Sequence, residues 1–168
     1  CSFVLTTILF WALHASKNVT AFPWDAGGYW RLSKLDALLN FPKEIRGYFY
    51  PLLLAPARML TDHFPALGYN PYRLLSSLVY AYVLTNMLPD FYAYILPARI
   101  SLWRRLVIPA LTALLFPGVI IYTLSDLPAV ALLLGAAVCA IKSSIDNKSH
   151  WARHALLVLS GIMAYGAY

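Results

Sequence analysis

The sequence predicts an all-α fold, a polytopic bundle of transmembrane helices with interfacial helices in its first outer loop. Hydrophobic residues make up 61% of the 168 residues, charged residues make up 12%, and the mean hydropathy is +0.65. A soluble fold of this length could not bury so much apolar surface. The apolar residues also fall into runs separated by polar or basic connections. We therefore expect residues 1–168 to form a single transmembrane domain of a multi-pass membrane protein.

The first apolar run, residues 1–16, is expected to be a transmembrane helix. A helix of this length reaches about 24 Å, which is short of a hydrocarbon core of about 30 Å. A signal peptide would also be apolar, but no Ala-x-Ala-like cleavage site follows the run. Because the chain starts at Cys1 and the last apolar run reaches Tyr168 without a polar flank, we expect a fragment of a longer protein.

Later apolar runs are long enough to cross a bilayer, whereas one shorter segment is not. The expected spans are residues 74–96, 106–124, 125–142 and 152–168. The segment 50–60 contains Pro51, Pro56 and Arg58, so it is too short and too interrupted to span comfortably. We expect it to lie in the membrane interface, within a long outer loop over residues 17–71.

Basic residues in the short connections predict the orientation of these helices. They form two groups, Arg99, Arg104 and Arg105 in one connection and Lys142, Lys148 and Arg153 in another. Such connections are expected to be cytoplasmic. The turn 122–126 and the loop 17–71 then share the outer face. The loop is itself net basic, which the rule would not favour on this side. Charges in long loops, however, contribute less to the orientation of a membrane protein than charges in short loops. Asp25 and Asp126 would consequently lie on one side of the membrane.

Asp25 is the first candidate catalytic residue. It lies in the segment Trp24-Asp25-Ala26-Gly27-Gly28-Tyr29-Trp30, directly after the first apolar run. A carboxylate at a membrane edge can act as a general base that takes the proton of an acceptor hydroxyl. Asp25 equally suits the N-cap of a helix, and the two roles are compatible. The ring of Tyr29 suits either the membrane interface or stacking against a sugar.

Cationic side chains of the same loop could hold a lipid-linked phosphate and stabilise its charge as it leaves. The candidates are Arg31, Lys43, Arg46 and Arg58. Arg58 is the best placed of them, because it lies on the Pro-containing segment beside the membrane. Attraction of a basic face to anionic lipid headgroups explains each cation equally well.

Asp126 is the second candidate catalytic residue, in the stretch Tyr122-Thr123-Leu124-Ser125-Asp126-Leu127-Pro128. A proline in the first helical turn after a Ser or Asp cap is a normal helix start, and this alone could explain the stretch. On the same face as Asp25, the carboxylate could also orient an acceptor or bind a cation. His150 and His154 have the spacing of two ligands but no accompanying Glu, so no metal site is predicted. A divalent cation remains possible.

Several other classes of function find no support in the sequence. It has no Gly-rich phosphate loop, no Cys-x-x-Cys pair and no nucleophile elbow. Cys1 and Cys139 imply no disulfide framework. The basic charge is spread over loops beside apolar runs, which argues against nucleic-acid binding.

The order of these features resembles the GT-C superfamily of polytopic glycosyltransferases, especially bacterial members of the protein mannosyltransferase and aminoarabinose transferase group. The matching residues are Asp25 with Tyr29, the Tyr-Phe-Tyr-Pro-Leu-Leu-Leu run over 48–54, which includes Tyr50, and the stretch 122–128. The chain resembles the amino-terminal portion of these enzymes. Many relatives have an Asp-Glu pair where Ala26 follows Asp25 here, a departure that speaks against metal-dependent variants.

This resemblance implies an inverting transfer of a sugar from a polyprenyl-phosphate or polyprenyl-diphosphate donor. The acceptor would be a hydroxyl of a glycan, lipid or protein at the outer membrane face. Asp25 would be the base, with Tyr29 and Tyr50 among the substrate-binding residues. The alternatives are a multi-span transporter or flippase and a non-catalytic scaffold subunit. Against transport, the apolar spans contain almost no charge and show no inverted repeat.

Overall fold

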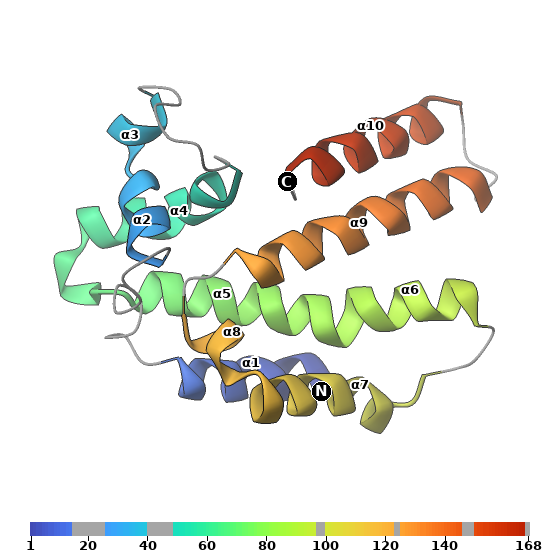
Figure 1. Ribbon diagram of the computed structural model, residues 1–168, viewed down its shortest axis with the longest axis horizontal. Helices are drawn as coiled ribbons and strands as arrows, with labels where there is room; N and C mark the ends of the chain where they lie inside the picture. The colour runs from blue at the N-terminus through green and yellow to red at the C-terminus, as the bar shows by residue number, and fades with distance from the viewer. Residues whose placement is uncertain (15–25, 40–48, 97–99, 123–124, 146–149, 167–168) are drawn as a thin grey trace.

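The computed structural model describes residues 1–14, 26–39, 49–96, 100–122, 125–145 and 150–166. Most of these residues form helices, and among them no β-strand occurs. The all-α expectation is confirmed. Several helical segments run beside one another, and the helices between residues 26 and 63 lie at one end of them (Figure 1).

The amino-terminal helix α1 (Ser2–Leu13) packs against α5 (Asn70–Tyr82), and an arginine of α5 caps its end. The Arg73 guanidinium donates a hydrogen bond to the carbonyl of Trp11 at 3.0 Å and another to the carbonyl of His14. These carbonyls belong to the last turn of α1, where no amide is available inside the helix to bond them. Arg73 also lies 4.5 Å from the centroid of the Trp11 ring. One charged side chain therefore fixes the end of α1 to α5.

Three helices of the first loop cover one end of the longer helices (Figure 1). They are α2 (Ala26–Leu32), α3 (Leu35–Leu39) and α4 (Phe49–His63). The expected interfacial segment 50–60 thus lies within a single helix, which continues through Pro56. A short 3₁₀ turn, η2 (Pro65–Leu67), leads to Gly68 at φ 53°, a left-handed conformation that glycine adopts without steric cost. The chain then enters α5.

Where the sequence predicts a helix over 74–96, the structure has α5 and α6 (Leu88–Ile95), joined by a π-helical turn, η3 (Val83–Met87). A π turn contains one extra residue and disturbs the regular hydrogen-bond ladder. At this turn the carbonyl of Thr85 accepts a hydrogen bond from Arg105 at 2.9 Å. Arg105 also reaches the Asp90 carboxylate at 3.3 Å.

The expected helix over 106–124 is divided in the structure. It forms α7 (Leu102–Leu115) and α8 (Pro117–Ile121), with a break at Phe116. Pro117 has no N–H to continue the ladder of α7 and begins α8 instead. The sequence analysis did not anticipate this break.

The two last helices, α9 (Asp126–Ile145) and α10 (His150–Gly166), form an antiparallel pair. Gly135 of α9 leaves room for the Met163 side chain, and the Ser160 hydroxyl donates to the Ala136 carbonyl at 2.9 Å. Among the described helices, α9 is the one that is long enough and apolar enough to cross a membrane.

Candidate functional site

The candidate site lies where the first-loop helices meet the turn that precedes α9. Tyr29, Arg31, Tyr50, Arg58 and Asp126 belong to the described part of the chain. The expected base Asp25 and the expected phosphate-binding residues Lys43 and Arg46 lie outside the described residues.

Tyr29 of α2 connects the first loop to the start of α9. Its phenol hydroxyl donates a hydrogen bond to Ser125 Oγ at 3.3 Å, across 96 positions of sequence. Its ring meets the Tyr50 ring edge to face, with centroids 5.1 Å apart. Tyr29 therefore brings together α2, α4 and the residue directly before Asp126.

Arg58 of α4 is held by two contacts. Its Nε donates to Asp62 Oδ2 at 3.0 Å, and its guanidinium carbon lies 5.0 Å from the centroid of the Trp30 ring. The side chain is 16% exposed. Because Asp62 occupies Nε, a phosphate at this site would be bound through the two Nη groups, which have no hydrogen-bond partner within the described ranges.

Arg31 and Asp126 are both exposed. Arg31 lies in the last turn of α2, and Asp126 is the first residue of α9. The negative carboxylate is thus at the positive end of a helix dipole. The cap position belongs to Ser125, whose carbonyl accepts the first helical hydrogen bond, from the Ala129 N–H at 2.9 Å. A helix-start role and a role toward an acceptor both remain compatible with this position.

Three buried tyrosines form the interior of the site. Tyr50 of α4 and Tyr72 and Tyr80 of α5 are at most 8% exposed, and their phenol groups act on one another electrostatically. The hydroxyls of Tyr50 and Tyr80 have no partner at ordinary hydrogen-bond distance and angle in the described part of the chain. Burial raises the pKa of the Tyr50 phenol well above its usual value, so the group remains a hydrogen-bond donor at neutral pH.

The sequence analysis selected Tyr29 and Tyr50 but not Tyr72 and Tyr80. A signal was present in their spacing. Tyr72, Ser76 and Tyr80 follow at four-residue intervals, which places three hydroxyls along one side of α5. All three are buried in the structure.

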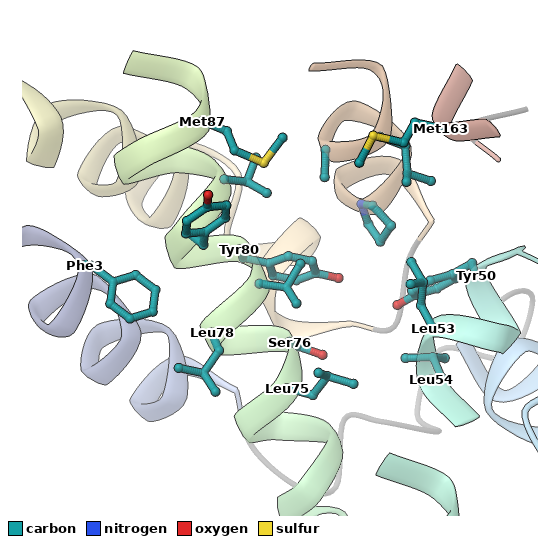
Figure 2. A pocket seen from close by; sticks show the side chains of 16 residues that line it. Phe3, Tyr50, Leu53, Leu54, Leu75, Ser76, Leu78, Tyr80, Met87 and Met163 are labelled. Atoms are coloured by element: carbon teal, nitrogen blue, oxygen red, sulfur yellow. The ribbon is translucent and has the colours of Figure 1, made fainter. Parts of the chain in front are cut away.

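An apolar cavity of about 450 Å³ adjoins Tyr50 and Tyr80. It lies between α4, α5, α9 and α10, and α1 contributes Phe3 (Figure 2). Tyr50 and Tyr80 direct their hydroxyls toward each other, and Met87 and Met163 lie at the end of the cavity away from Leu75 (Figure 2). Pro128, from the first turn of α9, also lines the cavity.

Metal ligands do not gather within the described ranges, where no group of three or more His, Cys, Asp or Glu side chains could hold an ion. His150 and His154 stack with ring centroids 4.3 Å apart, and His154 Nδ1 lies 2.8 Å from the His150 carbonyl oxygen. Their arrangement is that of two residues on consecutive turns at the start of α10.

Comparison of the chain with protein-family models, functionally characterised proteins and solved structures found no significant match.

Proposed function

We propose that this chain belongs to a multi-pass glycosyltransferase of the GT-C type in a bacterial plasma membrane. It would transfer a sugar from a polyprenyl-phosphate donor to an acceptor hydroxyl at the outer face. The observation that carries the proposal is the hydrogen bond from Tyr29 to Ser125. It joins the loop that contains Asp25 to the turn that contains Asp126. A single site that includes both acids requires these two segments to lie close together.

Exposed apolar side chains support a path of several membrane crossings. Large hydrophobic residues face outward on α1, α5, α7, α9 and α10, among them Ile8, Leu78, Leu114, Leu133 and Val158. Surfaces of this kind would be costly in water and favourable in a bilayer. The long segment from α5 through α6 has 26 residues by its bounds, Asn70 to Ile95, and would extend about 39 Å.

The proposed reaction follows from the chemical character of each residue. The Asp25 carboxylate accepts the proton of the acceptor hydroxyl while the oxygen of that hydroxyl forms a bond to the anomeric carbon of the sugar. The bond between that carbon and the phosphate oxygen breaks, and the lipid phosphate leaves with the electron pair. The Arg58 guanidinium stabilises the phosphate charge that develops. Asp126 positions the acceptor hydroxyl before the attack.

The test compares Asp25→Asn and Asp126→Asn with Asp36→Asn, an exposed acid of the same loop in α3. Transfer from a polyprenyl-phosphate sugar is measured in membranes that contain equal amounts of each protein. Loss of a general base lowers the rate by about 10²-fold or more, so Asp25→Asn should show at least this loss. The control should retain full transfer. Full activity of Asp25→Asn would remove Asp25 from the role of base.

A further inference from the structure

Two tryptophans are among the most exposed apolar side chains of the described part of the chain. Trp103 is 76% exposed and Trp151 is 86% exposed. Each is the second residue of its helix, α7 or α10, and an arginine follows each within two positions, Arg104 or Arg153. An exposed indole is costly in water, whereas at a membrane interface its ring meets lipid chains and its N–H meets headgroups. Both tryptophans therefore suit a lipid interface.

Exposed apolar side chains continue from each tryptophan along its helix. Val107 and Leu114 follow Trp103 at intervals of four and seven residues, and Val158 follows Trp151 at an interval of seven. Residues at these intervals lie on one face of a helix. Both α7 and α10 thus have an outward face that begins with tryptophan and becomes aliphatic. A helix that enters a bilayer from its interface has this profile.

Charge at this end of the molecule is mostly positive. The starts of α7 and α10 lie at or near the end where α6 and α9 finish (Figure 1). We call it the tryptophan end. The charged side chains described there are four cations and one acid, namely Arg104, Arg105, Lys142, Arg153 and Asp90. Arg105 pairs with Asp90, whereas Arg104 and Lys142 make no ion pair within the described ranges. These two cations are available to the phosphate of a lipid headgroup.

The opposite end of the molecule is more nearly balanced in charge. Its described cations are also four, but three acids accompany them, and the whole set is Arg31, Lys34, Arg58, Arg73, Asp36, Asp62 and Asp126. Arg58 is paired with Asp62, and Arg73 bonds carbonyls of α1. Among the described residues, the excess of positive charge is therefore greater at the tryptophan end.

We propose that the tryptophan end binds anionic phospholipids of the membrane. Trp103 and Trp151 lie in the interface, and Arg104, Lys142 and Arg153 attract the headgroup phosphates. A zwitterionic headgroup carries a cation of its own, so a lipid with net negative charge, such as phosphatidylglycerol, is bound in preference. This inference goes beyond the proposed function, because it concerns the end opposite the proposed transfer site and does not depend on the reaction.

Quenching of tryptophan fluorescence by brominated lipids tests this preference. The purified chain is placed in two kinds of nanodisc with the same mixture of phosphatidylcholine and phosphatidylglycerol, which differ only in the lipid that carries bromine. The signal of the two tryptophans is the difference between the chain and the double variant Trp103→Phe, Trp151→Phe. Brominated phosphatidylglycerol should quench this signal more strongly, and the preference should shrink at high salt, because salt screens exposed charges. Equal quenching by the two lipids, or none by either, would overturn the proposal.

Charge variants locate the preference at the tryptophan end. One basic residue near an anionic surface strengthens binding by about fivefold, so Arg104→Gln and Lys142→Gln should each lower the preference by up to about fivefold. Lys34→Gln is the matched control, since it removes an exposed cation between α2 and α3. It should leave the preference unchanged. An equal loss in Lys34→Gln would assign the preference to the overall charge of the chain and refute this surface.

An acidic protein is the competing partner for a basic surface, and a polyglutamate peptide serves as its probe. Equal quenching by the two lipids, together with peptide binding that Arg104→Gln weakens, would replace the lipid by an acidic protein. Sugar transfer is measured separately on the same samples. A chain that keeps the lipid preference but transfers no sugar would refute the proposed function and leave the lipid surface standing. Sugar transfer without any lipid preference would do the reverse.

Discussion

At Tyr29, one hydroxyl group links two loops that lie 96 positions apart in the sequence. The sequence analysis expected these loops to share a face of the membrane from the distribution of basic charge. It named Tyr29 for a different reason, as an aromatic ring suited to sugars. The hydrogen bond to Ser125 gives Tyr29 a role in positioning the two loops. Neither the charge distribution nor the suitability of its ring for sugars predicted this role.

The Tyr29–Ser125 bond can be measured by a double-mutant cycle. Tyr29→Phe and Ser125→Ala should each lower the free energy of unfolding by about 1 kcal/mol, and the double variant should lose little more than either single variant. Denaturant unfolding in detergent micelles provides the measurement. The cycle separates this bond from the other contacts of Tyr29. Strictly additive effects would show that the two residues are not coupled.

The individual site residues were predictable to different degrees. Arg58 was selected for its place beside the membrane, but its ion pair with Asp62 and its position over Trp30 depend on contacts that spacing alone does not specify. Tyr72 and Tyr80 could have been found from four-residue spacing on one helix. Asp25, the residue on which the chemistry depends most, lies outside the described residues and stays a prediction.

At the scale of elements, the end of α1 depends on a side chain from another helix. Arg73→Ala removes the hydrogen bonds from the guanidinium to the carbonyls of Trp11 and His14. We expect a loss of about 2 kcal/mol in the free energy of unfolding, because these are charge-assisted bonds. Arg104→Ala is the matched control, since Arg104 is exposed and makes no such bond within the described ranges. Equal stability of the two variants would show that the cap contributes nothing.

The contact between the end of α10 and the start of α4 allows a second test. A Cβ at Gly166 would lie 2.8 Å from the Phe49 ring, whereas a Cβ at Gly161 would meet nothing within 4 Å. Gly166→Ala should therefore destabilise the chain by roughly 1 kcal/mol or more. Gly161→Ala should stabilise it by about 0.5 kcal/mol through the greater helix propensity of alanine. Thermal unfolding of both variants in the same detergent gives the comparison, and the same sign for both would refute the contact.

The helices themselves were largely predictable, but the interruptions in them were not. Apolar runs and proline positions indicated where helical segments occur, including the helix around Pro56. Pro117 indicates the break between α7 and α8, but the length of the apolar run favoured a single continuous helix. The π turn at Val83–Met87 has no comparable local signal, because its carbonyl partner Arg105 comes from a different helix.

At the scale of the whole molecule, the orientation argument places its two ends on opposite sides of a membrane. The first-loop helices and the start of α9 lie at one end, and the last residues of α6 and α9 lie at the other (Figure 1). The described members of the basic groups, Arg104, Arg105, Lys142 and Arg153, fall at or near the second end. The membrane path drawn from charge patterning and helix lengths stays a prediction, whereas the cavity depends on side-chain packing among helices distant in sequence.

Cysteine labelling tests the orientation directly. In a background of Cys1→Ser and Cys139→Ala, single cysteines replace the exposed residues Asp62, Arg104 or Ser144. A membrane-impermeant maleimide should label Asp62→Cys in intact bacterial cells. It should label Arg104→Cys and Ser144→Cys only after the membrane is permeabilised. Labelling of Asp62→Cys and Arg104→Cys from the same side would exclude the proposed membrane path.

The π turn gives the long helix two different faces. Each residue advances a helix by about 100°, so the extra residue turns α6 by that angle relative to an uninterrupted continuation of α5. The helix can thus direct its tyrosines toward α4 at one end and Asp90 toward Arg105 of α7 at the other. Removing one residue from Val83–Met87 would bring both halves into one phase. One of these two sets of contacts would then be lost, although every side chain that makes them was still present.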